Sequence, residues 1–322
     1  MKIAVLDGYM MGHGDVSFAP VEALGDCAYY DSTDYANPAE IIEHIGDAEV
    51  ILVNKVPVTE EIFAACPKLS FICETATGYN NIDLQAAKKH GVIVSNVPTY
   101  GTNTVAQFAM ALLLEICNGV GHHAGEVAKG RWSQCKYNCF WDFSNIELAG
   151  KTVGIIGAGR IGMAFARMVQ GFGAEIIAGH PRKAGQDFEY GRYLTLDEVY
   201  QRADIISLHC PLTDETRHLL DAAAFAKMKQ GVMIINTARG GVIDHEALLD
   251  ALQSGRVAGA GLDVFPEEPC IPEALLALDN VVCTPHIGSN TAATRQDMLE
   301  ACAAQIQDVL AGKRPANIVN GI

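Results

Sequence analysis

Short apolar segments alternate with helical segments along the first hundred residues of the chain. Three stretches have the periodicity of amphipathic helices and lie at 38–46, 59–65 and 82–90. Around them are apolar runs with the length of buried strands, at 2–7, 28–30, 50–54, 69–74 and 92–96. This alternation predicts a parallel sheet covered by helices on both faces.

A second, larger series of the same kind begins at Lys151, after an apolar helix expected over 104–120. Its strands are expected in TVGIIG, EIIAG, IISLHC, VMIINTA, AGAGLDV and VVCTP. Because the series is complete by Pro285, we expect the helical tail at 290–310 to return to the first domain. The fold class is therefore α/β, with two doubly wound parallel-sheet domains. The predicted parts are 1–100, 101–288 and a return segment, 289–322.

The composition and net charge of the chain indicate which kinds of molecule it can bind. The chain has 322 residues, of which 49% are hydrophobic and 19% charged, as in ordinary globular proteins. Its formal net charge of -15, with no run of Lys and Arg, disfavours nucleic acid and anionic membranes as partners. An acid at Asp7 interrupts the first apolar run, and no later run reaches the roughly 18 residues of a membrane span. We therefore expect a cytoplasmic protein.

The ten cysteines are scattered and include no CxxC pair, which is typical of reduced thiols. One cluster, His122, His123, Cys135 and Cys139, resembles a set of metal ligands. Its spacing matches no zinc motif, so no metal is expected there.

A glycine motif begins the second series. The apolar run 153–156 leads into Gly157-x-Gly159-x-x-Gly162, and a helical pattern follows. In a dinucleotide-binding turn the first glycine permits the tight turn, the second lets the backbone approach the pyrophosphate, and the third allows close packing of the helix. With Arg160 and Ile161 between them, these glycines predict a cofactor site in the middle of the chain.

The next strand, 176–178, ends without the carboxylate that usually binds the adenosine ribose of NAD. The residues there are Gly179, His180, Pro181 and Arg182. Without the acid, the site lacks a hydrogen-bond acceptor for the ribose and no longer repels the 2′-phosphate of NADP. Arg182 can pair with that phosphate through charge-assisted hydrogen bonds. The cofactor is expected to be NAD or NADP, with NADP slightly favoured. The alternative is that Arg182 points into solvent and backbone contacts hold NAD.

Three later segments add candidate chemistry: INTARGGVID (235–244), AGLDVFPEEP (260–269) and TPHIGSNT (284–291). Each places polar residues after an apolar strand, at the carboxyl edge where doubly wound sheets bind ligands. A guanidinium can hold the carboxylate and carbonyl of a 2-oxo acid, and an imidazole can supply the proton that its reduction needs. A carboxylate beside that imidazole favours the imidazolium form. Arg239 as a helix cap, Glu268 as a loop charge and His286 as a core residue are the alternatives.

Together with ELAGKTVGIIGAGRIG, these segments resemble the D-isomer-specific 2-hydroxyacid dehydrogenases over nearly the whole chain. The resemblance implies a Rossmann-type nucleotide domain inserted in a smaller flavodoxin-like substrate domain. By matching position, it implies that Arg239 binds substrate, Glu268 is the carboxylate partner and His286 the acid/base. Asp263 matches the residue that holds the nicotinamide carboxamide.

The same resemblance implies further site residues. In the first domain the loop TATGYNNID (75–83) matches the one whose amides receive the substrate carboxylate. The substrate residues expected there are Ala76, Thr77 and Gly78, and Lys55 adds positive charge unless it is simply solvated. Residues expected to line the cofactor are Thr104, Cys210, Pro211, Thr216, Thr237, Ala238, His286 and Gly288.

The segments ATGYNNID, SNVP and CFWDF look most like the glycerate dehydrogenase or hydroxypyruvate reductase branch. We therefore expect NAD(P)H-dependent reduction of hydroxypyruvate or glyoxylate, small anionic 2-oxo acids. D-lactate-type dehydrogenases remain the enzymatic alternative, with formate and phosphite dehydrogenases less favoured. A nicotinamide-sensing corepressor is the alternative from another class. The family implies a homodimer, for which 104–120 and 121–149 are the candidate interface.

Overall fold

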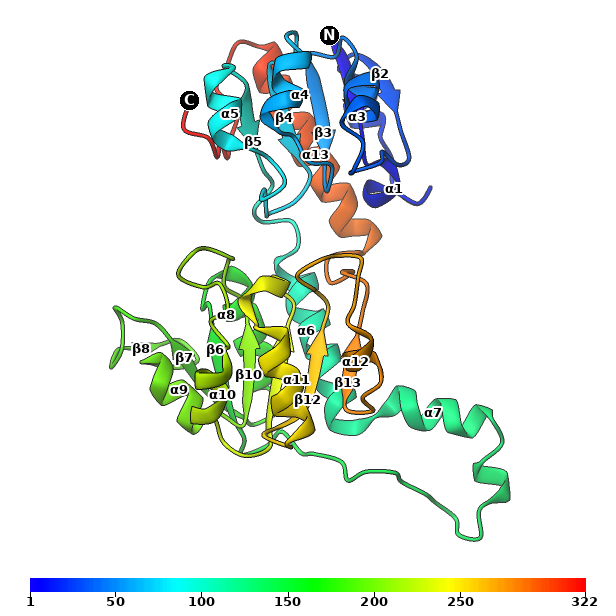
Figure 1. Cartoon of the computed structure of the whole chain (residues 1–322), viewed down its shortest axis with the longest axis vertical. Helices are drawn as coiled ribbons and strands as arrows, with labels where there is room; N and C mark the ends of the chain where they lie inside the picture. The colour runs from blue at the N-terminus through cyan, green and yellow to red at the C-terminus, as the bar shows by residue number, and fades with distance from the viewer. The chain divides into compact units, whose positions relative to one another are not determined.

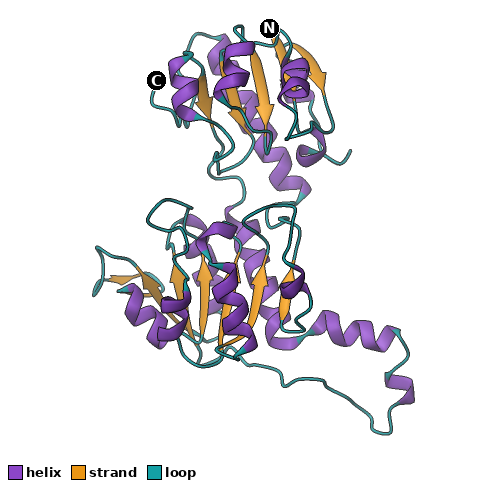
Figure 2. Cartoon of the chain, in the orientation of Figure 1, coloured by secondary structure: helices purple, strands orange, loops and turns teal.

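The computed structural model describes residues 1–322 as two compact units. The smaller unit consists of Met1–Gly101 and Ser289–Ile322, and the larger of Thr102–Gly288. Each unit contains one sheet with helices packed against it (Figures 1 and 2). The α/β fold class predicted from the alternation of apolar segments is confirmed.

The smaller unit has a fully parallel five-stranded sheet with the order β2-β1-β3-β4-β5. Its strands are β1 (Lys2–Val5), β2 (Asp26–Tyr29), β3 (Val50–Val53), β4 (Phe71–Glu74) and β5 (Ile93–Ser95). Its helices are α1 (Gly8–Met11), α2 (Ala19–Glu22), α3 (Pro38–Ile45), α4 (Glu60–Ala65), α5 (Leu84–Lys89) and α13 (Ala292–Leu310).

Helix α13 covers one face of this small sheet. Its residues Leu299, Cys302 and Ile306 are fully buried in one cluster with Ile3 and Phe71 of the strands. Helices α3, α4 and α5 supply the core on the other face. The tail thus belongs to the same compact unit as the first 101 residues.

The larger unit has an eight-stranded sheet with the order β13-β12-β11-β10-β6-β7-β9-β8. Its strands are β6 (Thr152–Ile156), β7 (Glu175–Gly179), β8 (Asp187–Phe188), β9 (Gly191–Leu194), β10 (Ile205–Leu208), β11 (Val232–Asn236), β12 (Val257–Leu262) and β13 (Val281–Cys283). Its helical elements are α6 (Thr102–Asn118), α7 (Val120–Ala128), η1 (Trp132–Gln134), α8 (Arg160–Gln170), α9 (Leu196–Arg202), α10 (Ala222–Lys227), η2 (Gly240–Val242), α11 (His245–Gln253) and α12 (Glu273–Leu276). Only the edge pair β8 and β9 is antiparallel.

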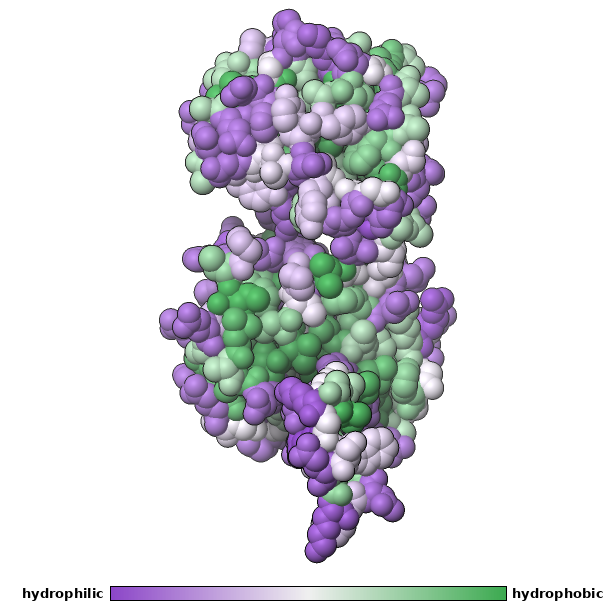
Figure 3. Space-filling model, turned by 90° about the vertical axis from the view of Figure 1, so that its right-hand side faces the viewer, coloured by the Kyte–Doolittle hydropathy of each residue, from purple (hydrophilic) through white to green (hydrophobic).

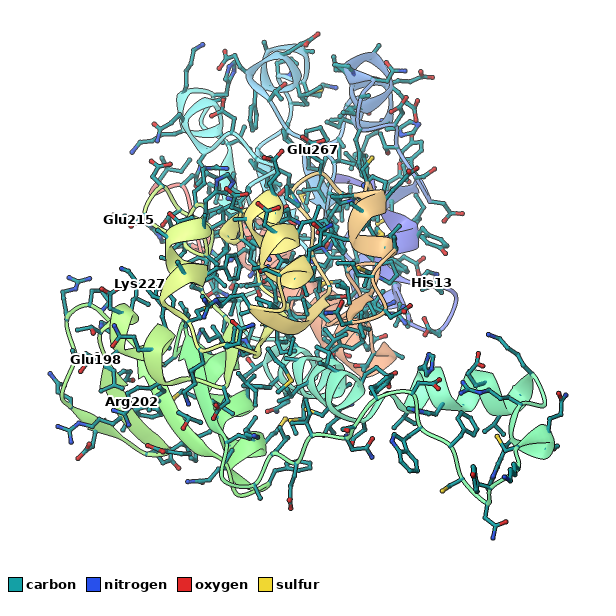
Figure 4. The ribbon with its side chains drawn as sticks, turned by 60° about the horizontal axis from the view of Figure 1, so that its bottom comes forward. His13, Glu198, Arg202, Glu215, Lys227 and Glu267 are labelled. Atoms are coloured by element: carbon teal, nitrogen blue, oxygen red, sulfur yellow. The ribbon has the colours of Figure 1, made fainter.

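Two hydrophobic clusters lie on the two faces of the larger sheet. Helices α6 and α8 pack on one face, and α9, α10 and α11 supply the other. Helix α9 shows how the sequence sets a helix end: Thr195 and Glu198 form a reciprocal capping box, and Arg202 lies in the last turn (Figure 4).

A sharp break follows α6. The helix ends at Asn118 and not at 120, because Gly119 adopts a left-handed conformation with φ of 52° before α7 begins. No single helix has the length and apolar content of a membrane span. Helices α6 and α7 pass such a test only as a pair bent by 62°, and many α6 side chains are buried in the core.

The chain after α6 leaves the body of the larger unit, as Figure 1 shows, and we call residues 120–145 the projecting arm. Asp142 joins the two ends of this arm by contacts with Arg131 and His122. Its carboxylate accepts two hydrogen bonds of 2.6 Å from Arg131 and lies 2.6 Å from Nε2 of His122. Several aromatic side chains of the arm are exposed, including Trp132, Tyr137 and Trp141.

Candidate active site

The glycine turn after β6 has the geometry that the motif predicts. Gly157 has a φ of 98°, and a Cβ there would overlap the backbone of His209 and Cys210 after β10. A Cβ at Gly162 would overlap the carbonyl oxygen of Gly157. Both glycines are therefore required by close contacts within the protein.

Gly159 differs from the other two glycines. A Cβ there would meet no protein atom within 4 Å, so packing within the chain does not require a glycine at this position. Gly159 is the N-cap of α8, which starts with Arg160 and Ile161. The N–H groups of this first helical turn form the type of site that binds phosphate, and the missing side chain lets a phosphate approach. The turn therefore fits a dinucleotide.

The residues next to the glycine turn, directly after β10, have uncharged side chains. His209 is half-buried, and desolvation of its imidazole lowers its pKa to about 3, while its Nε2 lies 2.9 Å from Oγ of Ser207. Burial also raises the pKa of the Cys210 thiol to about 11. In the loop that follows, Oγ1 of Thr216 donates to the carbonyl of Pro211 at 2.6 Å. The wall beside the glycine turn is thus uncharged at neutral pH.

The segment after β7 forms a local turn in which the N–H of Arg182 donates to Nδ1 of His180 at 3.1 Å. His180 packs edge-on against Tyr193, over which Nζ of Lys183 lies at 5.2 Å from the ring centre. Arg182 is exposed. The end of β7 therefore presents basic side chains and no carboxylate.

The turn after β11 holds Arg239. The amide of Asn236 accepts from the N–H of Ala238 and donates to the carbonyl of Arg239, both at 3.0 Å. Nη1 of Arg239 donates to the carbonyl of Ala238 at 2.7 Å, and its side chain is half-buried. At Gly240 a Cβ would overlap the backbone of Phe265 in the loop after β12. The loops after β11 and β12 are therefore packed backbone to backbone.

An imidazole and a carboxylate meet between the loops after β12 and β13. Nδ1 of His286 lies 2.7 Å from Oε2 of Glu268, while Oε1 of Glu268 accepts from the N–H of Phe265 at 3.2 Å. Glu268 follows Glu267, which Figure 4 labels. His286 has a positive φ of 55°, a strained conformation that fixes where the ring leaves the backbone. Because Nδ1 is hydrogen-bonded to the carboxylate, Nε2 is the ring nitrogen that can exchange a proton with a ligand.

Asp263 is buried at the end of β12 and binds the turn that carries His286. Its Oδ1 accepts from Oγ1 of Thr284 at 2.7 Å and from the N–H of Ile287 at 2.9 Å. Its Oδ2 accepts from the N–H of Gly288 at 2.8 Å. Burial raises the pKa of this carboxyl, although these donors oppose the change. Asp263 therefore has a structural task, the anchoring of the 284–288 turn, in addition to the cofactor contact that the resemblance implies.

The predicted substrate loop lies at the carboxyl edge of the small sheet and is held at its backbone. The carbonyl of Ala76 accepts from the N–H of Val97 at 3.1 Å, and that of Thr77 accepts from the Asn96 amide at 2.7 Å. The hydroxyl of Thr77 donates to the carbonyl of Val97 at 3.3 Å. Gly78 follows and is half-buried.

Asp7 was not predicted as part of any site, yet it organises the neighbouring loop of the small unit. Its Oδ2 accepts from the N–H groups of Asn54, Lys55 and Val56 at 2.7, 2.9 and 3.2 Å. Its Oδ1 accepts from the hydroxyl of Tyr35 at 2.8 Å. The sequence signal for it was its position at the end of the first strand, where ligand-facing loops begin. The backbone of Lys55 is thus fixed at this edge.

The remaining predicted residues lie in the larger unit. Thr104 is in the first turn of α6, and Oγ1 of Thr237, just after β11, is buried without a hydrogen-bond partner. In the suspected ligand cluster, His122 and His123 come together with Asp142 and not with Cys135 and Cys139, the three ligand atoms lying within 4.8 Å of one another. Arg131 also binds that carboxylate, and Nδ1 of His123 lies 2.8 Å from the carbonyl of Gly119.

Comparison with known proteins agrees with this geometry. Residues 110–288 match the family described as D-isomer specific 2-hydroxyacid dehydrogenase, NAD binding domain. The chain belongs to this family. A hydroxypyruvate reductase of Blautia hydrogenotrophica is 44% identical, covering 99% of this chain and all of that protein. A glyoxylate reductase of Thermococcus litoralis is 41% identical over 85% of this chain and 83% of its own length.

A solved structure extends the likeness to the fold and the cofactor. The NADPH-dependent glyoxylate/hydroxypyruvate reductase of Sinorhizobium meliloti, in complex with NADP and malonate, superposes with a TM-score of 0.83 at 29% identity. The match covers 99% of this chain and 96% of that one. The chain is therefore an oxidoreductase that uses NAD or NADP, and its expected place in the hydroxypyruvate reductase branch is confirmed.

The close approach at Gly240 generates a prediction. We expect Gly240→Ala to displace the loop after β12 and to separate Glu268 from His286, since a Cβ there would overlap the backbone of Phe265. Both the melting temperature and kcat/KM should fall. Gly241→Ala is the matched control, because its Cβ would meet side chains and no backbone, with Leu212 nearest at 3.1 Å and Arg217 at 3.8 Å. Equal behaviour of the two variants would contradict the role of this contact.

Proposed function

We propose that the chain reduces hydroxypyruvate or glyoxylate to the D-2-hydroxy acid at the expense of NAD(P)H. The observation that carries this proposal is the 2.7 Å contact between His286 and Glu268 in a chain of this family. The names of its relatives support the choice of small, polar 2-oxo acids.

In this proposal the larger unit binds the cofactor with residues at the carboxyl edge of its sheet. The N-terminus of α8, with Gly157, Gly159 and Gly162, binds the pyrophosphate. The bound nicotinamide supplies the hydride. The other proposed cofactor contacts are Thr104, Arg160, Ile161, His180, Arg182, Cys210, Pro211, Thr216, Thr237, Ala238, Asp263, His286 and Gly288.

Arg239 binds the substrate carboxylate and polarises the carbonyl, because a planar guanidinium donates in two parallel directions. Its position is set by the Asn236 turn and by the hydrogen bond to Ala238. In the smaller unit, Ala76, Thr77 and Gly78 are the proposed backbone donors to a substrate carboxylate, and Lys55 is the proposed source of positive charge. A 2-oxo acid is thus recognised by its charge and by its two adjacent oxygen-bearing groups.

His286 supplies the proton that the developing alkoxide needs. The Glu268 carboxylate accepts a hydrogen bond from Nδ1 of His286 and stabilises the imidazolium. The proton transferred to substrate is therefore the one on Nε2. In the oxidative direction the same nitrogen takes the proton from the hydroxyl. The hydrogen bond from Phe265 to Glu268 keeps the carboxylate facing the ring.

His286→Ala tests the assignment. We expect kcat for hydroxypyruvate to fall about 100- to 10,000-fold, the usual contribution of a general acid, while the affinity for NADPH changes little. The measurements are initial rates with hydroxypyruvate, glyoxylate, phenylpyruvate and 2-oxoisocaproate, and cofactor fluorescence titration. Near-normal turnover would remove His286 from the mechanism. In the wild-type protein, faster turnover of phenylpyruvate and 2-oxoisocaproate than of hydroxypyruvate and glyoxylate would contradict the proposed substrate. If the wild-type protein turned over none of the four acids, a protein-binding role would be favoured.

The basic end of β7 supports a preference for NADP. The turn carries His180, Arg182 and Lys183 where an acid would repel the 2′-phosphate. A hydrogen bond to a charged group contributes about 1.5–3 kcal/mol, so Arg182→Ala should raise KM for NADPH roughly tenfold or more and leave KM for NADH nearly unchanged. His180→Asp should shift the preference toward NADH.

Arg202→Ala is the matched control for the NADPH measurement. Arg202 is an exposed arginine in the last turn of α9 and pairs with Glu175 at 3.4 Å (Figure 4). Strong NADH preference in the wild-type protein, unchanged by Arg182→Ala, would contradict the proposal.

We also infer a homodimer in the cytoplasm, a compartment that suits ten free thiols. One face of the larger unit carries a concentration of hydrophobic residues, and the projecting arm extends from the same side (Figure 3). An apolar surface of this kind is typical of an interface. Sedimentation equilibrium should give twice the mass of the chain, and Tyr137→Asp with Trp132→Asp in the exposed arm should weaken association. A monomer at micromolar concentration would contradict the dimer.

A further inference from the structure

Glu74 is a buried carboxyl group to which the proposed chemistry gives no role. It is the last residue of β4, directly before the loop 75–80, and its side chain is fully buried. Oε2 accepts one hydrogen bond, of 3.0 Å, from Nδ2 of Asn81. Oε1 is buried and has no hydrogen-bond partner. A charged carboxylate in this position would leave one oxygen without any donor.

Asp7, at the end of β1, gives the contrast. Four donors surround its carboxylate, three backbone N–H groups and the hydroxyl of Tyr35. Glu74 has one donor, so the structure provides for a charge on Asp7 and not on Glu74.

The groups that face Glu74 strengthen this difference. Burial is the largest cause that raises the pKa of Glu74 well above its ordinary value, and the charge of Asp7 acts in the same direction. The Cys73 thiol on β4 also raises it, while the Asn81 hydrogen bond and Lys55 lower it. Cys302 of α13 contacts Cys73 and is itself fully buried. Burial prevails because Glu74 has only one donor.

The contact with Asn81 joins the two ends of the loop 75–80. Nδ2 of Asn81 also donates to the carbonyl of Val56 at 3.1 Å, and the N–H of Val58 donates to the carbonyl of Asn81 at 2.9 Å. The Asn81 side chain thereby ties the end of β4 to the segment after β3. Residues 76–78, proposed above to receive the substrate carboxylate, lie inside the loop that this contact closes.

We propose that Glu74 is a positioning residue that works in its neutral form. Its carboxylic acid group accepts from Asn81 across the base of the loop 75–80. Ionisation makes this oxygen a better acceptor but leaves a buried charge with a single donor, and the loop opens because water then supplies the missing donors. Ionisation places a second negative charge beside Asp7 in the protein interior, and entry of water relieves that cost. Thr77 and Asn80 of this loop are exposed, so an opening of the loop brings solvent to the carboxyl. The link to substrate affinity rests on the proposed function.

Thermal melts of wild-type protein and Glu74→Gln test the proton without any substrate. The raised pKa means that folded Glu74 keeps a proton which the unfolded chain releases above about 4.3, so wild-type stability falls as pH rises from there toward the folded pKa. Gln cannot ionise and is spared this loss. The melting temperature of Glu74→Gln minus that of wild type should therefore grow from pH 5 to pH 8. An unchanged difference would overturn the proposal, and Glu61→Gln, exposed on α4, controls for a lost surface charge.

Hydrogen exchange tests the loop directly. At pH 8.5 the amides of 75–80 should exchange several-fold faster in wild type than in Glu74→Gln, and at pH 6 the two proteins should agree. Asn81→Ala should show fast exchange at both pH values, because the contact itself is lost. Equal exchange in wild type and Glu74→Gln at every pH would show that the proton does not control the loop.

Substrate affinity gives the functional readout. The ratio of KM for hydroxypyruvate in wild type to that in Glu74→Gln should rise roughly fivefold or more between pH 6 and pH 8.5. His286 and Glu268 are present in both proteins, so their contribution to KM cancels in the ratio. A flat ratio in an active enzyme would disprove the positioning role. Absence of turnover in wild type would instead disprove the proposed function, and the melts and exchange rates would still decide whether Glu74 acts on the loop.

Discussion

Parallel strands in one sheet bring all their carboxyl ends to one edge, and the chemistry of this chain depends on that constraint. Residues on separate connections of the chain become neighbours because β11, β12 and β13 are adjacent in the sheet. Glu268 and His286 meet for this reason. The small sheet repeats the arrangement, with Asp7, Asn54 and the loop after β4 at its own carboxyl edge.

At both edges the polar side chains first stabilise the loops that carry them. Asp7, Asn236 and Asp263 each bind backbone groups of a loop at the same edge, which gives these connections a defined shape without regular secondary structure. The turn with His286 is fixed by three donors to one buried carboxylate. A reactive ring held in this way needs little reorganisation when substrate binds.

Much of the fold could be predicted from the sequence because strongly apolar strands at regular spacing leave few alternatives. The edge strands β8 and β9 were missed, since DF and GRYL are too short and too polar to show a strand pattern. The end of α6 was misplaced because one glycine in a left-handed conformation has no periodic signal. The pairing of His286 with Glu268 was implied by resemblance alone. Asp142 and Glu74 gave no local sign of their roles, which depend on partners that folding brings together.

The division of the small unit into two stretches of sequence affects the order in which the protein can form during synthesis. Residues 102–288 are contiguous and contain both faces of their sheet, so this unit is complete before the ribosome reaches α13. The first 101 residues emerge earlier, yet one face of their sheet lacks Leu299, Cys302 and Ile306 until the last helix is made. The sheet that is made first is thus covered on both faces only after the last helix has been made.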